Sequence, residues 1–279
     1  MKIAIQGQIA SFHDVAARQL FGDDIELICC ETFADVFAAL KSHQADYAVT
    51  AVENSLHGPI TQVYDLLLRD TPWIFKETYL QIHQCLVGLP GTRIADIKEV
   101  YSHVAALSQC EDFLTHQLHN AKHLEHADTA GAAADVAKWK DETKAAIASA
   151  AAAAHYGLEV IQANIETNPH NYTRFVALSR KKQPTSDATK TSIVLRTNHQ
   201  TGALYRALGV FEQHGINLTM LTSRPIAGQH QRYMFYVDFT AGIDSLAASH
   251  ITQELRALEC DVTVLGSYEA AKISGTSIG

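Results

Sequence analysis

No apolar run in this chain is long enough to cross a bilayer, and no long run of basic residues occurs along its 279 positions. The formal net charge is −8, so the sequence indicates no nucleic-acid partner. An anionic substrate would need local cations or helix N-termini to attract it, because the overall field repels it. The N-terminus enters an apolar strand at once, without a signal-peptide pattern, which predicts a cytoplasmic protein with no membrane partner.

Motifs for metals and dinucleotides are also scarce. The five cysteines are odd in number and lack paired spacing, so reduced, mostly buried thiols are expected. Four of the 15 histidines recur at helical spacing (His116, His119, His123 and His126), but no carboxylate set completes a site. We therefore predict no metal. Gly7 follows the first strand without the second glycine that would support dinucleotide binding.

The first 180 residues alternate short apolar strands with amphipathic helices. We predict strands at residues 2–5, 26–29, 47–52, 80–87, 100–102, 144–149 and 159–161, and helices at 13–21, 33–41, 60–68, 105–118, 129–138 and over the alanine run from 150. This alternation predicts an open, largely parallel α/β sheet with helices on both faces. Ligands of such sheets bind beyond the carboxyl ends of the strands.

A polar segment precedes a second pattern. Residues 181–190 include Pro184 and lack periodicity, which is typical of a linker. After it we predict a strand at 192–196, a helix at 203–214, strands at 217–224 and 233–239, a helix at 245–258 and a strand at 261–268. The order βαββαβ is that of a ferredoxin-like sandwich. The sequence therefore predicts one domain at 1–180, a linker at 181–190, a second domain at 191–270 and a C-terminal tail at 271–279.

Thr173 and Arg174 directly precede an apolar segment, residues 175–178, that is expected to form a strand. Adjacent strand residues point to opposite faces, so Thr173 and Phe175 share a face. At the start of the strand the backbone need not be regular, so both polar side chains could reach a neighbouring cleft. The arginine offers a planar fork for a carboxylate, and the threonine offers an uncharged proton donor.

Four further turns lead from a strand into a helix and carry small polar side chains, among them Ser11, Asn54, Ser55 and Ser102. Such turns expose backbone N–H groups and a helix dipole toward an anion. Together with Thr173 they predict a pocket rich in hydroxyls and amides but poor in titratable pairs. No Ser-His-Asp arrangement and no lysine placed for a Schiff base accompanies them.

The order of these motifs resembles the prephenate dehydratase family, and the resemblance covers nearly the whole chain. The second domain resembles the ACT regulatory domain of that family. The matching segments are Gly7…Ser11-Phe12…Ala16-Ala17, Glu53-Asn54-Ser55…Gly58…Asp65-Leu66-Leu67, Ser102-His103…Ala106-Leu107…Gln109-Cys110, Asp128-Thr129-Ala130, Ala148-Ser149…Tyr156-Gly157-Leu158, Asn171-Tyr172-Thr173-Arg174-Phe175, Gly202-Ala203-Leu204-Tyr205 and Ser223-Arg224-Pro225.

The resemblance implies two α/β subdomains folded like a type-II periplasmic binding protein, with the active site in their cleft. The family removes CO2 and water from prephenate to give phenylpyruvate and needs no cofactor, because aromatisation drives the fragmentation. Thr173 matches the proposed general acid, and Arg174 would anchor a carboxylate or shape the site. Since an unperturbed threonine hydroxyl is a very poor acid, we prefer a role for Thr173 as a hydrogen-bond donor to the departing hydroxide. The substrate-binding residues expected are Ser11, Asn54, Ser55, Ser102, Asn171 and Phe175.

The chain departs from the family pattern at two active-site motifs. The usual Gly-Thr-Phe-Ser is here Ala10-Ser11-Phe12-His13, which keeps one hydroxyl and loses the next. The usual Ser-His-Pro-Gln-Ala-Leu is here Ser102-His103-Val104-Ala105-Ala106-Leu107, which drops a proline and a polar amide. Neither change affects Thr173 or Arg174.

In the family, the two ACT motifs meet at a domain dimer interface and bind phenylalanine. The resemblance therefore implies an L-phenylalanine site at Gly202, Ala203, Leu204, Ser223, Arg224 and Pro225 in a homodimer or homotetramer. Thr222 replaces the usual glutamate before the second motif. Three alternatives stay open: arogenate as the substrate, an ACT domain that dimerises without a ligand, and a non-catalytic amino-acid or keto-acid sensor.

Overall fold

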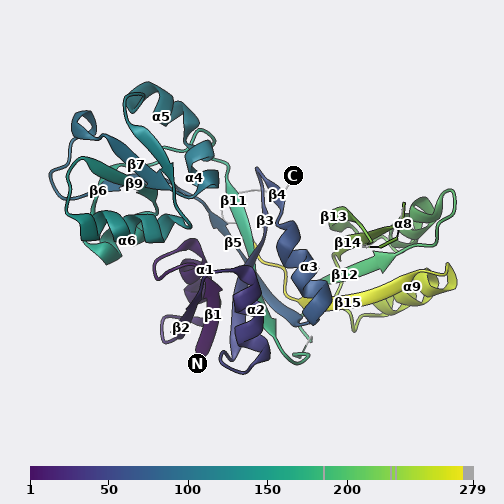
Figure 1. The fold of residues 1–279 in the computed structure, drawn as a ribbon. Coiled ribbons are helices and arrows are strands. Elements are labelled where there is room, and N and C mark those ends of the chain that lie inside the picture. Colours follow the sequence, from purple (N-terminus) through teal and green to yellow (C-terminus); the bar gives the residue numbers. More distant parts are fainter. Residues whose placement is uncertain (185, 227, 230, 273–279) are drawn as a thin grey trace. The chain divides into compact units, whose positions relative to one another are not determined.

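The computed structural model describes residues 1–184, 186–226, 228–229 and 231–272. The chain divides into two compact units, the first formed by residues 1–60 and 79–175, and the second by 61–78 and 176–279 (Figure 1). The chain passes between the units three times, once directly before helix α3 (Thr61–Asp70) and twice within strands, in β5 (Trp73–Gln81) and β11 (Tyr172–Ser179). Among the described residues, no helix has both the length and the apolar character needed to span a bilayer.

The first sheet of the first unit carries the N-terminal strands in the order β11-β3-β1-β2. Strand β1 pairs in parallel with both of its neighbours, β2 and β3. Helix α1 begins after Ser11, and a capping box between Thr32 and Asp35 starts helix α2. The elements are β1 (Lys2–Gln6), α1 (Phe12–Phe21), β2 (Glu26–Cys30), α2 (Phe33–Lys41), β3 (Tyr47–Asn54) and β4 (Gly58–Pro59).

The second sheet of this unit has the order β10-β6-β9-β7-β8. Strand alternation separates two cores: Val87 faces the helices α6 and α7, whereas Leu86 faces α4 and α5. In Figure 1, α5 and α6 accordingly lie on opposite sides of the sheet. The elements are β6 (Cys85–Gly88), η1 (Ile94–Asp96), β7 (Glu99–Ser102), α4 (Val104–Gln109), α5 (Glu111–Gln117), β8 (Lys122–Glu125), α6 (Thr129–Trp139), β9 (Lys144–Ala148), α7 (Ala150–Tyr156) and β10 (Glu159–Gln162).

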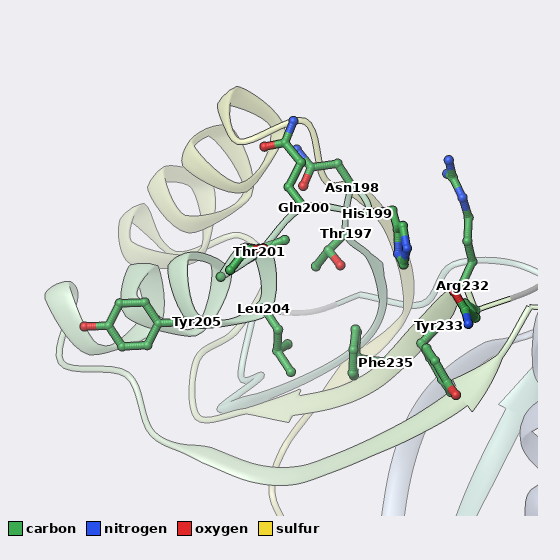
Figure 2. A pocket seen from close by; sticks show the side chains of 13 residues that line it. Thr197, Asn198, His199, Gln200, Thr201, Leu204, Tyr205, Arg232, Tyr233 and Phe235 are labelled. Carbon is green, nitrogen blue, oxygen red and sulfur yellow. The ribbon is translucent and has the colours of Figure 1, made fainter.

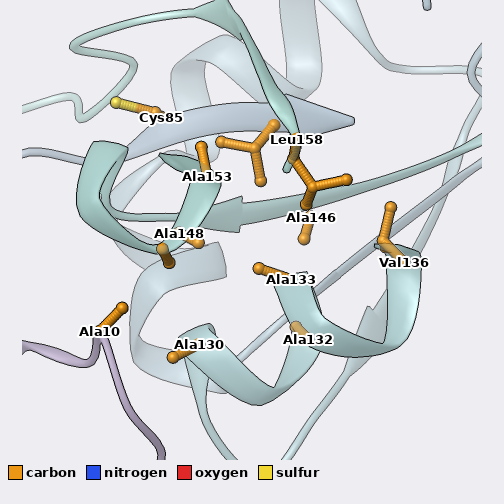
Figure 3. Close-up of a cluster of buried hydrophobic side chains, with 12 residues drawn as sticks. Ala10, Cys85, Ala130, Ala132, Ala133, Val136, Ala146, Ala148, Ala153 and Leu158 are labelled. Atoms are coloured by element: carbon orange, nitrogen blue, oxygen red, sulfur yellow. The ribbon is translucent and has the colours of Figure 1, made fainter. Parts of the chain in front are cut away.

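The core beneath α6 and α7 consists mostly of alanine (Figure 3). Ala130, Ala132 and Ala133 of α6 pack with Ala146 and Ala148 of β9, all of them fully buried. Small side chains allow the helix backbones to approach the strands closely. The helix N-termini and the ends of the strands are thereby held at fixed positions.

The second unit contains the βαββαβ order and helix α3. Its strands run β13-β14-β12-β15-β5, with antiparallel pairs among the last four strands of the chain and a parallel pair between Gly266 of β15 and Ile74 of β5. Helices α8 and α9 pack on one face of this sheet through Phe211 and Ile251. The elements are α3 (Thr61–Asp70), β12 (Lys190–Arg196), α8 (Ala203–Gln213), β13 (Leu218–Pro225), β14 (Tyr233–Phe239), α9 (Leu246–Ala257) and β15 (Asp261–Tyr268).

Helix α3 is fixed to this unit by two polar contacts. The Tyr236 hydroxyl donates to the carbonyl oxygen of Tyr64 at 2.9 Å, and the two rings lie 4.7 Å apart. A guanidinium nitrogen of Arg224 lies 2.6 Å from a carboxylate oxygen of Asp65. A helix that precedes the second domain by more than 100 residues therefore packs against its sheet.

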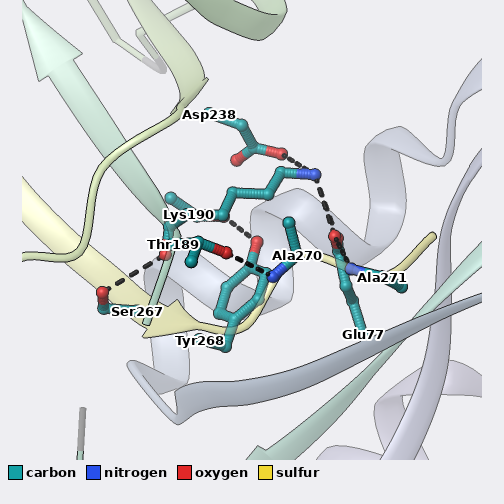
Figure 4. A network of polar contacts seen from close by, with 9 residues as sticks. Glu77, Thr189, Lys190, Asp238, Ser267, Tyr268, Ala270 and Ala271 are labelled. Carbon is teal, nitrogen blue, oxygen red and sulfur yellow. Dashed lines mark hydrogen bonds and ion pairs between the residues drawn. The ribbon is translucent and has the colours of Figure 1, made fainter. Parts of the chain in front are cut away.

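A buried ion network holds β5 to the same sheet (Figure 4). Nζ of Lys190 lies 3.0 Å from Oε2 of Glu77 and 3.8 Å from Oδ2 of Asp238, and all three side chains are almost fully buried. The backbone N–H of Ala271 also donates to Glu77. Lys190 lies between the two carboxylates and the Ala271 N–H donates to one of them, which offsets part of the cost of burying these charges.

The predicted fold class, two α/β subdomains followed by βαββαβ, is confirmed. Two predicted elements are wrong. The strand predicted at 80–87 joins the last two residues of β5, which begins at Trp73, to most of β6. The two strands are separate because the Gln84 N–H donates to the Glu166 side chain instead of to a neighbouring strand. The helix predicted at 105–118 breaks at Cys110, whose φ of −109° and ψ of 19° are not helical.

Strand β8 was not predicted, because three of its four residues are exposed and show no apolar pattern. The second sheet is also mixed, since β6 pairs antiparallel with both β9 and β10. Thr185 in the predicted linker, and the predicted tail from residue 273 onward, lie outside the described residues.

Candidate active site

A cavity of about 390 Å³ lies within the first unit. Residues from all four predicted strand-to-helix turns line it, together with the start of β11. Glutamine and asparagine amides, histidine rings and apolar groups dominate the wall. The lining residues are Gln6, Gly7, Ser11, Phe12, His13, Phe33, Ala51, Asn54, His57, Ile60, Ile82, Gln84, His103, Ala105, Ala106, Gln109, Ala127, Asp128, Thr129, Thr173 and Phe175.

Thr173 and Phe175 face this cavity from the same side of β11. The Thr173 side chain is 9% exposed, so its hydroxyl is shielded from bulk water. Nδ2 of Asn54 donates to Oγ1 of Thr173 at 3.0 Å. Because that oxygen accepts from the protein, its own proton is left to donate to a group in the cavity.

The orientation of the Asn54 amide follows from its other contacts. Its Oδ1 accepts the backbone N–H groups of Leu56 and His57 at 3.0 and 3.1 Å. Nδ2 must therefore be the atom that faces Thr173, and it also donates to Oδ1 of Asn171 at 2.7 Å. This assignment makes Asn54 a fixed donor to the threonine hydroxyl.

Two long helices begin at the cavity and are capped by residues that line it. Oγ of Ser11 accepts from the Asp14 N–H at the start of α1, and Oδ1 of Asp128 accepts from the Gly131 N–H at the start of α6. Both positive helix ends therefore lie at the cavity wall. Gly131 fits here because a Cβ would lie 2.8 Å from the Asp128 carboxylate.

Four of the predicted site residues do not line the cavity. Arg174 points to the other face of β11 and is 3% exposed, and Ser102 is fully buried and donates to the carbonyl oxygen of Ile147. Ser55 and Asn171 instead support the wall. Ser55 exchanges hydrogen bonds with the backbone on either side of Asn171, and Asn171 accepts from Asn54.

His13 is a lining residue that the sequence did not single out. Its Nε2 accepts the Ala51 backbone N–H at 3.2 Å, and its ring meets Phe175 edge-on with centroids 5.1 Å apart. Burial lowers the pKa of His13 to about 4, so the ring is neutral at physiological pH. The only sequence signal was the loss of the family's hydroxyl at this position.

Gln84 and Gln109 form a second polar pair in the wall. Nε2 of Gln84 donates to Oε1 of Gln109 at 3.1 Å, and the Gln84 backbone N–H donates to Glu166. No lysine or arginine is among the described residues that line the cavity. An anion bound there would be held by neutral donors and helix N-termini.

A second cavity of about 440 Å³ lies in the second unit, around the start of α8 (Figure 2). Gly202, Ala203 and Leu204 line it, as does Arg232 from the segment before β14. Gly202 has a φ of +75°, which glycine adopts without strain, and it leaves the first turn of α8 without a side-chain cap. Backbone N–H groups at this helix end can therefore receive a carboxylate.

The second predicted phenylalanine motif does not line this cavity. Ser223, Arg224 and Pro225 lie on β13, and Arg224 pairs with Asp65. Within one chain, the two motifs therefore do not meet in one cavity. The described residues contain no group of three or more histidine, cysteine or acidic side chains arranged to hold a metal.

Comparison with known proteins gives a consistent family assignment. A family model described as prephenate dehydratase matches residues 3–183. Arogenate dehydratase/prephenate dehydratase 6 of Arabidopsis thaliana is 38% identical over 96% of this chain and 68% of its own length. A prephenate dehydratase from Arthrobacter aurescens, solved in complex with L-Phe, is 28% identical with a TM-score of 0.86 and covers 97% of this chain and 90% of its own. A structure described as GqqA, a novel type of quorum quenching acylase, is 32% identical with a TM-score of 0.86 over 97% of this chain and 98% of its own.

Proposed function

Because this chain belongs to the prephenate dehydratase family, we propose that it converts prephenate into phenylpyruvate, CO2 and water, a step of phenylalanine biosynthesis. The observation that carries the proposal is the Thr173 hydroxyl, which lines the cavity while its oxygen accepts from Asn54. Fragmentation of the ring substrate needs a donor at the departing hydroxyl and a rigid grip on the carboxylates.

The reaction balances without an external electron donor or acceptor. The bond to the ring carboxylate breaks and releases CO2, and its electron pair moves through the ring to expel hydroxide. The expelled hydroxide takes up a proton to become water. Thr173 donates a hydrogen bond to the oxygen on which the negative charge develops, which stabilises the transition state most when the donor is already oriented.

The residues outside the cavity have supporting roles in this proposal. Arg174 shapes the site from the opposite face of β11. Asn171 and Ser55 hold Asn54 and the start of β11 in register, and Ser102 fixes the end of β7 against β9. Ser11 and Phe175 contact the substrate directly, the first as a helix cap and the second as an apolar wall.

Thr173→Ala tests the catalytic role. We expect turnover of prephenate to be lost while substrate affinity is largely preserved, because the carboxylate contacts remain. Thr173→Ser, which keeps the hydroxyl, is the matched control and should retain most activity. A near-wild-type kcat in Thr173→Ala would show that the assigned role is wrong, and no turnover in the wild type would favour the sensor alternative.

Arogenate is a second candidate substrate. It bears an ammonium group where prephenate bears a keto group, and the Asp128 carboxylate in the cavity wall offers a partner for that charge. Parallel assays with both substrates decide between them through kcat/KM. Asp128→Asn should lower kcat/KM for arogenate more than for prephenate if the ammonium binds there.

The cavity gives no reason to propose the acylase activity named for one structural neighbour. Acyl transfer needs a nucleophile activated by a base. Among the described residues that line the cavity, no hydroxyl or thiol donates to a histidine. Dehydration therefore remains the activity that this site supports best.

L-Phenylalanine is the proposed effector, bound at the start of α8. The carboxylate of L-phenylalanine can accept hydrogen bonds from the uncapped first turn and from Arg232. Its apolar ring can pack against Leu204 and Phe235. Calorimetry with L-phenylalanine should show binding, and the effector should reduce turnover. Gly202→Ala, which strains the left-handed backbone, should weaken binding without lowering the uninhibited rate, and absence of heat at millimolar effector would remove the proposal.

In the proposed assembly, Ser223, Arg224 and Pro225 complete the effector site from a second copy of the chain. The assembly is a homodimer or homotetramer, which sedimentation analysis with and without L-phenylalanine can establish. A cytoplasmic location is proposed as well, although the Arabidopsis relative is named as chloroplastic. Fractionation of the source cells tests that location.

A further inference from the structure

His13 has one ring nitrogen that the protein uses and one that it does not. Nε2 accepts the Ala51 backbone N–H at 3.2 Å. A nitrogen that accepts carries no proton, so the neutral ring must carry its proton on Nδ1. The backbone of β3 thereby selects one tautomer of His13.

Nδ1 has no hydrogen-bond partner among the described residues, and it is not one of the fully enclosed polar atoms that lack one. The His13 side chain is 9% exposed and lines the cavity. An N–H that is accessible from the cavity and has no protein partner is available to donate to an acceptor on a ligand. The cavity is the place from which such an acceptor can come.

The ring is also held rigidly. It contacts Phe33 with centroids 5.8 Å apart and Phe175 with centroids 5.1 Å apart at an interplanar angle of 88°. Phe175 is two residues from Thr173 on the same face of β11, and His13 and Thr173 both line the cavity. A donor fixed by three neighbours needs no reorganisation when a ligand binds.

The lack of positive charge in the cavity wall indicates which acceptor the Nδ1–H of His13 meets. No lysine or arginine is among the described lining residues, and the chain carries a net charge of −8. The carboxylates of the substrate must then be held by neutral N–H donors and helix ends. A neutral imidazole N–H adds such a donor without the cost of burying a cation.

We propose that His13 donates a hydrogen bond from Nδ1 to a carboxylate oxygen of the substrate and so acts as a substrate-binding residue of this chain. The proposal rests on the proposed dehydratase function and adds a contact to it. His13 occupies the position where the family pattern has a serine hydroxyl. The longer ring extends the donor further into the cavity than a serine would.

Two substitutions separate this role from a structural one. His13→Asn keeps an amide donor at the position of Nδ1 and loses the acceptor for Ala51. His13→Gln keeps an acceptor near the position of Nε2 and loses the donor near Nδ1. If His13 only accepted from Ala51, the glutamine variant would be the better enzyme.

We expect the opposite order. His13→Gln should raise KM for the better substrate about 10- to 100-fold with kcat changed less than about threefold, since a uniform binding contact is lost. His13→Asn should stay within about fivefold of the wild-type KM, because a neutral amide donor replaces a neutral imidazole donor. Equal KM values for the wild type and His13→Gln, or a larger loss in His13→Asn, would overturn the proposal.

A readout independent of turnover uses nitrogen NMR of labelled histidine. The free enzyme should show His13 protonated on Nδ1 only, and addition of phenylpyruvate, which keeps one carboxylate, should move that proton signal downfield. A signal from protonated Nε2, or no movement with saturating phenylpyruvate, would also overturn the proposal. If instead the wild type turned over neither prephenate nor arogenate, the proposed function itself would fail.

Discussion

Asn54→Asp should abolish most of the activity while leaving the fold nearly intact. In the wild type, Nδ2 of Asn54 donates to Oγ1 of Thr173 at 3.0 Å and to Oδ1 of Asn171 at 2.7 Å. The substitution replaces this donor with a carboxylate oxygen of almost the same size and position. The Thr173 hydroxyl then has an acceptor beside it, and its proton turns toward the new carboxylate and away from the cavity.

The magnitude follows from the contacts that change. Loss of one oriented donor to a developing oxyanion costs about 10²- to 10³-fold in kcat, or about 3–4 kcal/mol. The cost to folding should be smaller, because the other carboxylate oxygen still accepts the N–H groups of Leu56 and His57. Nδ2 of Asn171 is buried without a partner among the described residues, so its amide can rotate and donate to the new carboxylate.

The assay is steady-state turnover of prephenate, read as phenylpyruvate, together with thermal unfolding of the same samples. Asn217→Asp is the matched control, because Asn217 is exposed, does not line the cavity and gains the same charge. We expect the control to keep kcat within about twofold, as surface substitutions usually do. An Asn54→Asp variant that kept kcat within about threefold of the wild type would refute the reasoning, because Thr173 would then not need the donor behind it.

Four further predictions have defined outcomes. Lys190→Met removes the cation that lies between two buried carboxylates and should lower the free energy of unfolding by about 3–5 kcal/mol in urea titrations, whereas no change would show that the network is solvated. Gly266→Ala places a Cβ 2.1 Å from a backbone oxygen of β5 and should destabilise the protein by about 1–3 kcal/mol. Gly209→Ala on α8, where a Cβ meets nothing within 4 Å, should stabilise it by about 0.5–1 kcal/mol. Equal melting temperatures for the two variants would contradict both expectations. Ala10→Gly should change the free energy of unfolding by less than about 1 kcal/mol, because relief of the positive φ of Ala10 (+66°) is offset by the loss of a buried methyl group and by the greater freedom of glycine in the unfolded chain. A loss of more than about 2 kcal/mol would show that there is no strain at this position. Finally, burial lowers the pKa of His13 to about 4, so between pH 6.5 and 4 the unfolded chain binds a proton that the folded protein does not. The free energy of unfolding of the wild type should therefore fall by about 3 kcal/mol relative to His13→Phe as the pH is lowered from 6.5 to 4. Parallel stability profiles of the two proteins over this range would exclude the lowered pKa.

Much of the fold could be predicted from periodicity, and the failures have local causes. Strands and helices with clear apolar patterns appear within one or two residues of their predicted bounds. The break between β5 and β6 depends on Glu166, which reaches the Gln84 backbone across 82 positions of sequence. No local pattern contains that contact, so the prediction joined the end of β5 to β6 in one strand and missed residues 73–79 of β5.

The parts of the candidate site that could be predicted are those in which strand alternation alone determines the face on which a side chain lies. Alternation places Thr173 and Phe175 on one face of β11, and the structure has both in the cavity wall. The same rule places Arg174 on the opposite face, and its expected reach into the cleft depended on an irregular strand start. Strand β11 begins at Tyr172, so Arg174 is already within regular structure.

The roles of Asn54 and His13 could not be read from the sequence. Asn54 meets Thr173 across 119 positions, and the orientation of its amide is set by two backbone N–H groups of the following turn. The tautomer of His13 depends on the Ala51 N–H, 38 positions away. The orientation of the Asn54 amide and the tautomer of His13 are both set by backbone N–H groups that only the folded chain brings next to these side chains.

The two cavities use helix N-termini in different ways, and this difference supports separate roles for them. At α1 and α6, the side chains of Ser11 and Asp128 already accept first-turn N–H groups, so these ends present a fixed, partly satisfied positive dipole. At α8 the Ala203 N–H donates to the carbonyl oxygen of Gln200, but the first turn begins at Gly202 without a side-chain cap, so an incoming carboxylate can act as the cap. A capped end suits a site that must keep one geometry through a reaction, whereas an uncapped end gains a cap when an amino acid binds. Binding of L-phenylalanine should therefore order the start of α8, and protection of its amide hydrogens from exchange on addition of the effector would be the direct sign of it.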